Sequence, residues 1–136
     1  MIKGIAYIGV AVRDLEQARR KFTEHLGSKI IRVGASEIDH VKNTYLMLGE
    51  DVFELMEPTS PVSPVARFME RRGEGVQYVG LEVTNLDEDM RELRGKGLRF
   101  TPGSPIEYPD GSRWAFIHPK EMCGVLLALI ENPISA

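Results

Sequence analysis

The sequence predicts an α+β fold built from two similar βαβββ modules, and three features lead to that prediction. The first is an internal repeat, because YIGVAVRDL at residues 7–15 returns as YVGLEVTNL at residues 78–86, an offset of 71 residues (78 − 7 = 71). The second is that each copy runs into a segment with helical spacing of apolar residues, and the third is that short strand-like segments follow. One such module cannot bury its own sheet face, so we expect the two to form a curved mixed sheet around a cleft.

Each predicted helix is bounded by residues typical of helix ends. In the first copy Asp14 and Gln17 fit a capping box, and Gly27 fits a C-terminal stop. In the second copy Asn85 and Glu88 repeat the box. The strands predicted after the helices are 29–33, 43–48 and 52–56 in the first module and 98–100, 113–117 and 125–130 in the second, with a loop at 102–113.

A proline-punctuated linker separates the modules. It contains Ser63, a natural N-cap, followed by Pro64, which suits the first position of a short helix. We expect a single domain over residues 1–136, with module one at about 1–57, the linker and its helix at about 58–75, and module two at about 76–131.

Composition and charge exclude several classes of partner. Seventeen basic against 20 acidic residues give a net charge of −3, which provides no basic stripe for nucleic acid. No apolar stretch is long enough to span a bilayer. The single cysteine, Cys123, forms no intrachain disulfide, which suits a reducing compartment, so we expect a cytoplasmic protein.

Strand alternation divides the residues of each repeated strand between two faces. In the first copy the branched residues Ile8, Val10 and Val12 share one face, which we expect to pack under the helices. The other face opens with a tyrosine in both copies, Tyr7 and Tyr78, followed by small residues. This second face is predicted to line a cavity.

Two carboxylates belong to the same predicted faces. Glu82 follows Tyr78 by four residues, and Glu54 alternates with Phe53 and Leu55 on its strand. They are candidates for chemistry in the cavity. The alternative is that they point to open water or pair with a basic residue, since antiparallel sheets often leave one face wet.

The sequence resembles the vicinal oxygen chelate superfamily, which includes glyoxalases and bleomycin resistance proteins, and within it the methylmalonyl-CoA epimerases. The resemblance runs from about Ile5 to Ile130, and its most specific segments are 8–15, 48–75 and FIHPKEMCGVLLAL at 116–129. It implies the vicinal oxygen chelate fold for the two modules, isomerase or lyase chemistry, a small carbonyl or acyl-CoA ligand, and a homodimer.

The resemblance also implies a metal site, whose ligands are mostly replaced here. The two histidine ligands of those epimerases match Tyr7 and Tyr78, the Glu or Gln ligand of the ELMEP motif matches Glu54, and a fourth, glutamate ligand matches Ala128. At neutral pH a phenol is a poor ligand for a divalent ion compared with imidazole, and alanine offers no donor. We therefore expect no metal and no cofactor.

The acid–base residues implied by the resemblance are also altered. Epimerisation uses two carboxylates on opposite faces of the substrate, and one of them matches Ala128. The other lies in a loop that here reads SEIDHV, where Glu37 or Asp39 could take its place beside His40. Lys120 matches an HPK motif and could pair with a CoA phosphate, although a lysine in a surface turn is the alternative.

Two functions follow as hypotheses. The first is a metal-independent enzyme that transfers a proton next to a carbonyl, in which the tyrosines stabilise the developing enolate oxygen. Its candidate residues are Tyr7, Glu54, Tyr78, Glu82, Asp39 and His40. The tyrosines could instead simply fill a vestigial metal pocket. The second function is non-catalytic binding or sequestration of a small molecule, of the bleomycin-resistance type, although aromatic residues make up only 7% of the chain.

Overall fold

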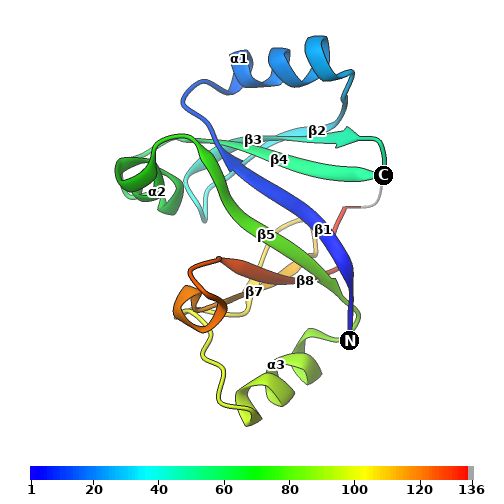
Figure 1. Cartoon of the computed structure of the whole chain (residues 1–136), viewed down its shortest axis with the longest axis vertical. Coiled ribbons are helices and arrows are strands. Elements are labelled where there is room, and N and C mark those ends of the chain that lie inside the picture. Colours follow the sequence, from blue (N-terminus) through cyan, green and yellow to red (C-terminus); the bar gives the residue numbers. More distant parts are fainter. Residues whose placement is uncertain (135–136) are drawn as a thin grey trace. The chain divides into compact units, whose positions relative to one another are not determined.

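Each module has the predicted order of one strand, one helix and three further strands in the computed structural model, which describes residues 1–134 (Figure 1). The first module consists of β1 (Ile2–Ala11), α1 (Leu15–Arg20) with a π-helical continuation (Lys21–His25), β2 (Lys29–Ser36), β3 (Val41–Leu48) and β4 (Asp51–Pro58). The second consists of β5 (Gly75–Val83), α3 (Leu86–Gly95), β6 (Ile106–Glu107), β7 (Arg113–Ile117), a 3-10 turn (Pro119–Met122) and β8 (Leu127–Glu131). The linker carries α2 (Pro64–Arg72). The predicted α+β class with two βαβββ modules is confirmed.

The chain packs as two compact units. Residues 7–77 form the N-terminal unit, and residues 1–6 with the segment that begins at Tyr78 form the C-terminal unit, so β1 contributes to both. The strand order is β2-β3-β4-β1 in the N-terminal unit and β5-β8-β7-β6 in the C-terminal unit. In each unit the first and last strands of the module are parallel and the other pairs are antiparallel. The two modules therefore share one topology.

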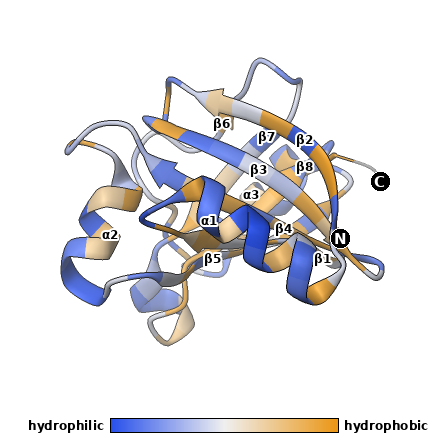
Figure 2. Cartoon of the chain, turned by 90° about the horizontal axis from the view of Figure 1, so that it is seen from above, coloured by the Kyte–Doolittle hydropathy of each residue, from blue (hydrophilic) through white to orange (hydrophobic). Residues whose placement is uncertain are grey.

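The branched strand faces pack under the helices, as alternation predicts. In the N-terminal unit Val12 forms a core with Leu15 of α1 and with Leu46 and Leu55 of the sheet. The corresponding core of the C-terminal unit consists of Val83, Leu86, Met90, Ala115, Ile117 and Leu129. Figure 2 shows that α1 and α2 each carry both hydrophilic and hydrophobic residues, as amphipathic helices do.

The α-helices α1, α2 and α3 each begin at the residue expected to cap them. The Asp14 carboxylate accepts a hydrogen bond from the Gln17 N–H (3.0 Å), and the Asn85 side-chain oxygen accepts one from the Glu88 N–H (3.2 Å). The buried Ser63 hydroxyl accepts one from the Val65 N–H at the start of α2 (3.1 Å). These side chains satisfy backbone donors that a helix leaves without partners in its first turn.

Besides its cap, the first turn of α1 and of α3 is held by a carboxylate from the last strand of the same module. Glu57 near the end of β4 accepts a hydrogen bond from the Leu15 N–H (2.9 Å). Glu131 at the end of β8 accepts one from the Leu86 N–H (3.0 Å). The duplication therefore extends to the contacts that attach each helix to its sheet.

The prediction of a strand at residues 98–100 is wrong. Only an isolated bridge joins Phe100 to Ile117, and the strand that pairs with β7 on the side away from β8 is β6, inside the predicted loop. The Leu98 N–H bonds back to the Leu93 carbonyl at the end of α3 (3.0 Å), and Leu98 and Phe100 pack against the core. These apolar residues complete the helix end, which explains why their strand-like pattern was misleading.

None of the helices in the described part of the chain is long and apolar enough to cross a membrane.

Candidate functional site

The candidate site in the N-terminal unit lies on the sheet face opposite α1. A two-residue turn at Gly49 (φ 61°) and Glu50 joins β3 to β4, and the pairing it sets places Tyr45 opposite Glu54. A glycine with positive φ at the first turn position is typical of a tight hairpin. On the other side of β4, Gly9 of β1 lies opposite Glu54 and has no side chain to cover it. Glu54 therefore lies in a row between an aromatic ring and a glycine.

Glu54 is the only buried acidic or basic residue within residues 1–134, with 5% of its surface exposed. Its Oε2 accepts a hydrogen bond from Asn43 Nδ2 (2.8 Å), and Asn43 is itself 7% exposed. Burial of a carboxylate is costly unless donors are directed at it. The amide of Asn43 is such a donor.

Tyr7 lies on the same face and is fully buried. Its ring is tilted against that of Tyr45, with centroids 5.0 Å apart, and the guanidinium of Arg32 lies over the Tyr45 ring at 4.8 Å. We call Tyr7, Asn43, Tyr45 and Glu54 the Glu54 cluster. It brings together two residues predicted from the sequence, Tyr7 and Glu54, and adds two that were not predicted.

The C-terminal unit has a counterpart of the Glu54 cluster, in which the acid is replaced by an alanine among aromatic residues. Ala128 lies opposite Gly80 of β5 and Phe116 of β7, as Glu54 lies opposite a glycine and a tyrosine. Tyr78 is buried, and its ring meets Trp114 and Phe116 edge-on, with centroids 5.4 Å and 6.3 Å away. We call the set Tyr78, Tyr108, Trp114, Phe116 and Ala128 the Ala128 cluster, since Tyr108 in turn contacts Trp114.

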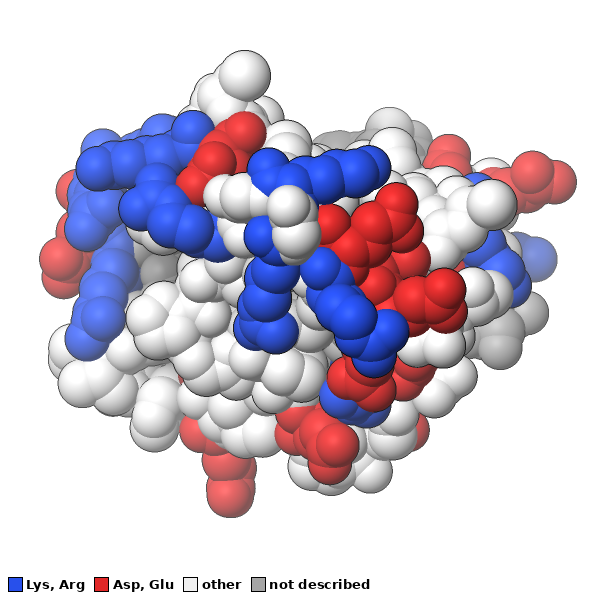
Figure 3. Space-filling view, turned by 90° about the horizontal axis from the view of Figure 1, so that it is seen from below, with Lys and Arg blue, Asp and Glu red and all other residues white. Residues whose placement is uncertain are grey.

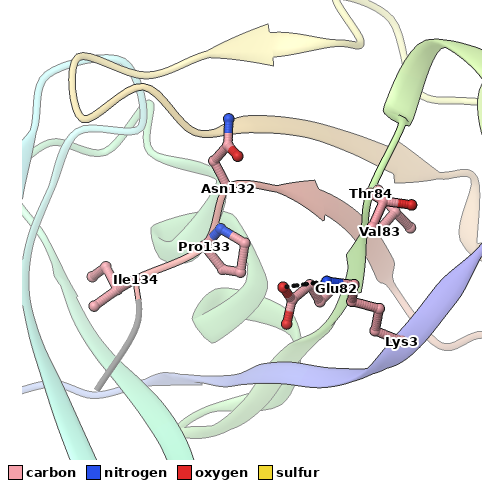
Figure 4. Close-up of a pocket in the computed structure, with 7 residues that line it drawn as sticks. All are labelled: Lys3, Glu82, Val83, Thr84, Asn132, Pro133 and Ile134. Atoms are coloured by element: carbon pink, nitrogen blue, oxygen red, sulfur yellow. Dashed lines mark ion pairs between the residues drawn. The ribbon is translucent and has the colours of Figure 1, made fainter.

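Glu82 is not buried with these aromatic residues. Its side chain is 39% exposed, and its Oε2 lies 3.9 Å from Lys3 Nζ. The pair borders a hollow of about 320 Å³, together with Thr84 and Asn132 among others (Figure 4). Glu82 was expected either to act as a base in the cavity or to pair with a basic residue. Its described contacts fit the pairing better.

Asp39 and His40 occupy the turn between β2 and β3. The Ser36 hydroxyl donates to Asp39 Oδ2 (3.3 Å) and accepts from the Asp39 N–H (3.2 Å). His40 is exposed, with φ 52°, and its carbonyl accepts a hydrogen bond from the Thr59 N–H (2.8 Å). The described contacts of both residues hold the turn in its conformation.

Lys120 is exposed on the 3-10 turn after β7, where its backbone N–H donates to His118 Nδ1 (3.3 Å). Figure 3 shows a face of the molecule on which Lys and Arg side chains lie beside Asp and Glu side chains, without a purely basic surface. The location of Lys120 fits a surface turn and leaves a phosphate contact as a proposal.

The residues at the expected metal positions do not fit a divalent ion. Those positions hold Tyr7, Glu54, Tyr78 and Ala128, which supply two phenols, one carboxylate and one methyl group. Imidazole, thiolate and carboxylate groups are the usual ligands of such ions. Over residues 1–134 no three His, Cys, Asp or Glu side chains are grouped so that they could hold a metal. No step below is therefore assigned to a metal.

Asn43 and Tyr45 could have been found from the sequence. The Gly49–Glu50 pair between two strand-like segments predicts a tight hairpin, and such a hairpin fixes which residues face each other. Tyr45 is then opposite Glu54, and Asn43 is its diagonal neighbour. The turn residues, and not a sequence motif, therefore indicate that Asn43 and Tyr45 lie near Glu54.

Comparisons with known proteins agree with this architecture. Residues 7–116 match the Glyoxalase/Bleomycin resistance protein/Dioxygenase superfamily. The ethylmalonyl-CoA/methylmalonyl-CoA epimerase of Cereibacter sphaeroides is 31% identical over 134 residues, which cover 95% of this chain and 98% of that protein.

Two solved structures show the same fold over nearly the whole chain. Methylmalonyl-CoA epimerase from Mycobacterium tuberculosis has a TM-score of 0.91 and 31% identity, covering 98% of this chain and 89% of that chain. A variant of the Streptomyces coelicolor methylmalonyl-CoA epimerase in complex with 2-nitronate-propionyl-CoA has a TM-score of 0.91 and 27% identity, covering 98% and 100%. The chain therefore belongs to the glyoxalase, bleomycin resistance protein and dioxygenase superfamily and is similar to its methylmalonyl-CoA epimerases.

Proposed function

We propose that the chain is an enzyme of the isomerase type that transfers a proton next to a carbonyl without a metal ion, and that its substrate is an acyl-CoA thioester. The observation that supports this most directly is the Glu54 cluster, in which a single buried carboxylate is held by an amide donor beside two tyrosines. The acyl-CoA class comes from the names of the similar epimerases.

Glu54 is the first candidate for the proton-transfer base, because burial keeps water from competing for its carboxylate. Tyr7 is proposed to donate a hydrogen bond to the oxygen on which negative charge develops, the function that a metal ion would otherwise serve. Tyr78 remains a second candidate for this hydrogen bond. Glu82, Asp39 and His40 remain secondary candidates because Glu82 lies beside a lysine and the described contacts of the other two hold a turn in place. Lys120 is the candidate for a CoA phosphate.

The test is deuterium incorporation from deuterium oxide at the carbon next to the thioester, measured by mass spectrometry. Methylmalonyl-CoA and propionyl-CoA are suitable probes, with protein purified in the presence of a chelator. We expect incorporation that requires the protein and that is unchanged by added cobalt, nickel or magnesium. Incorporation that appears only after metal addition, with about one ion bound per chain, would show that the metal-independent mechanism is wrong.

The second candidate function, sequestration of a small molecule, is favoured by the Ala128 cluster. Four aromatic residues there contact one another in series, and one of them, Phe116, lies opposite a position that carries no acid. Aromatic rings offer apolar area and defined stacking geometry to a ligand. Tight binding of a ligand without proton exchange or turnover would support this function over the enzymatic one.

A homodimer is proposed as the assembly of the chain. Ile2 and Ile5 of β1 are large apolar residues that lie more than half exposed in the single chain, and such residues gather at interfaces between subunits. Light scattering coupled to size exclusion should give a mass of twice 15.3 kDa. A mass of one chain across the concentration range would contradict the dimer.

A further inference from the structure

The hollow beside Glu82 lies at the end of β5, in the C-terminal unit. Tyr78, Gly80 and Glu82 alternate along one face of β5, so Glu82 continues the row that begins in the Ala128 cluster. Ile130 of β8 stands opposite Glu82, is fully buried, and reaches over Gly80, where an added methyl group would collide with it. The side chain of Ile130 therefore fills the face between Tyr78 and Glu82 and leaves the hollow apart from the aromatic rings.

The lining of the hollow combines a cation, an anion and an apolar wall. Lys3 and Glu82 supply the charges. Figure 4 shows Pro133 and Ile134 to one side of this pair, on the chain that leaves β8. Asn132 before them has a left-handed backbone (φ 59°), which asparagine adopts more readily than most residues. The volume of about 320 Å³ is at the small end of the range for ligand sites.

The ion pair between Lys3 and Glu82 is loose. Its Nζ and Oε2 atoms lie 3.9 Å apart, and the two side chains are 55% and 39% exposed. In the same unit the Met1 ammonium lies 2.8 Å from the Asp89 carboxylate, the length of a charge-assisted hydrogen bond. An exposed pair as long as that of Lys3 and Glu82 contributes little to stability. A ligand that binds to both groups therefore breaks no strong interaction.

The fold does not require an acid at the position of Glu82. The corresponding residue of the first module is Ala11, at the offset of the repeat (82 − 11 = 71). Ala11 pairs with Met56 of the parallel neighbour, as Glu82 pairs with Ile130. Since Ala11 is fully buried, the first module closes this place with a methyl group, whereas the second module places a carboxylate at a hollow.

We propose that this hollow binds a small zwitterion, namely an amino acid with an apolar side chain. Lys3 donates hydrogen bonds to the carboxylate of the ligand, Glu82 accepts them from its ammonium group, and Pro133 and Ile134 contact its side chain. A ligand with a single charge is attracted by one of the two charged residues and repelled by the other, whereas a zwitterion is complementary to both. The inference goes beyond the proposed function and does not depend on it, because Glu82 acts here as a binding residue.

The first test is a titration of isotope-labelled protein with leucine, N-acetylleucine and leucinamide at low ionic strength, followed by nuclear magnetic resonance. N-acetylleucine lacks the ammonium charge, and leucinamide lacks the carboxylate. We expect leucine to move the backbone amide signals of Thr84 and Asn132, which line the hollow. Leucine should bind about tenfold or more tightly than either derivative, because each derivative loses a hydrogen bond between charged groups. Unmoved signals, or equal binding of the three probes, would overturn the inference.

The second test removes one charge at a time. Lys3→Met and Glu82→Gln keep the length of the side chain, and each should weaken leucine binding about tenfold or more. The matched control is Lys96→Met, because Lys96 is also exposed (65%), also lies near a carboxylate (3.5 Å from Glu92), and does not line the hollow. It should bind leucine as the wild type does. Unchanged affinity in either Lys3→Met or Glu82→Gln would show that the site is assigned wrongly.

The third test exchanges the two charges. The double variant Lys3→Glu with Glu82→Lys keeps one cation and one anion at the hollow, and a zwitterion can bind there in the reverse orientation. It should bind leucine about fivefold or more tightly than Lys3→Glu alone, in which two carboxylates face the ligand. Melting temperatures show whether each variant is folded. A folded double variant that binds leucine no better than Lys3→Glu would contradict the inference, whatever the result of deuterium exchange with acyl-CoA.

Discussion

The buried Glu54 carboxylate accepts a hydrogen bond from Asn43, and this bond guides the design of a test of its chemistry. The substitution Glu54→Gln keeps the size of the side chain and an oxygen that accepts from Asn43, so the fold should be retained. Loss of the carboxylate should lower proton exchange by about 100-fold or more, the usual range for a general base. Exchange rate and melting temperature are measured on the same preparation. A variant that melts like the wild type and exchanges as fast would exclude Glu54 as the base.

The two tyrosines make separate predictions, since each belongs to its own cluster. Tyr7→Phe and Tyr78→Phe keep the aromatic ring and remove the phenol, so packing is largely preserved. If the phenols stabilise an enolate oxygen, each variant should lose about tenfold or more in exchange rate. The double variant shows whether the two losses are independent. Unchanged exchange and ligand affinity in both single variants would mean that the tyrosines only fill space.

Strand alternation at the residue level predicted the correct face for Tyr7 and for Glu54. It did not identify Asn43, because the bond between Asn43 and Glu54 depends on the pairing of two strands and not on either strand alone. For Glu82, strand alternation predicted the face of the strand on which the side chain lies, but it did not predict how exposed that side chain is. Its side chain is 39% exposed and lies beside Lys3, which is far from it in the sequence.

Among the elements, the helices were the most predictable because their ends are decided locally. Ser63, Asp14 and Asn85 each cap the helix that they were expected to cap. The strand predicted at residues 98–100 failed because its apolar pattern serves the end of α3. A short apolar run has the same pattern in both cases.

The attachment of α1 and α3 to their sheets leads to a prediction at this scale. Glu57→Ala and Glu131→Ala each leave a partly buried backbone N–H of the first helical turn without its acceptor. Each should lower the free energy of unfolding by about 1–3 kcal/mol, the usual cost of such a group. Urea unfolding followed by circular dichroism measures it, with the exposed Glu50→Ala as the control. Two variants as stable as the control would show that these bonds contribute nothing.

The stability of the whole molecule depends on pH, and the ion pair between Arg113 and Asp87 contributes to that dependence. Hydrogen bonds from Arg113 lower the pKa of Asp87, with charge attraction adding to the effect, and the pKa of Arg113 is raised in turn. A carboxyl group with a lowered pKa stabilises the folded protein at pH values above its ordinary pKa of 3.8. That stabilisation is lost as the pH falls through the lowered pKa.

Removal of Arg113 should therefore make the free energy of unfolding depend less on pH at acidic pH. Arg113→Met is expected to lose less stability than the wild type between about pH 5 and about pH 2, because Asp87 loses the main cause of its lowered pKa. Thermal melts across this range measure it. Since Asp87 is on the surface, high salt should shrink the difference, and a difference that persists at high salt would point to a cause other than this pair.

The strands β4 and β8 each carry two residues with unrelated functions, three positions apart. Glu57 and Glu131 keep a helix attached, whereas Glu54 and Ala128 only face the site. The two modules therefore differ at the site position and share the attachment of the helix. The same separation offers a starting point for engineering, but Ala128 is fully buried, so Ala128→Glu would need a hydrogen-bond donor introduced beside it, as Asn43 stands beside Glu54. One half of the protein can thus serve as the template for redesigning the other.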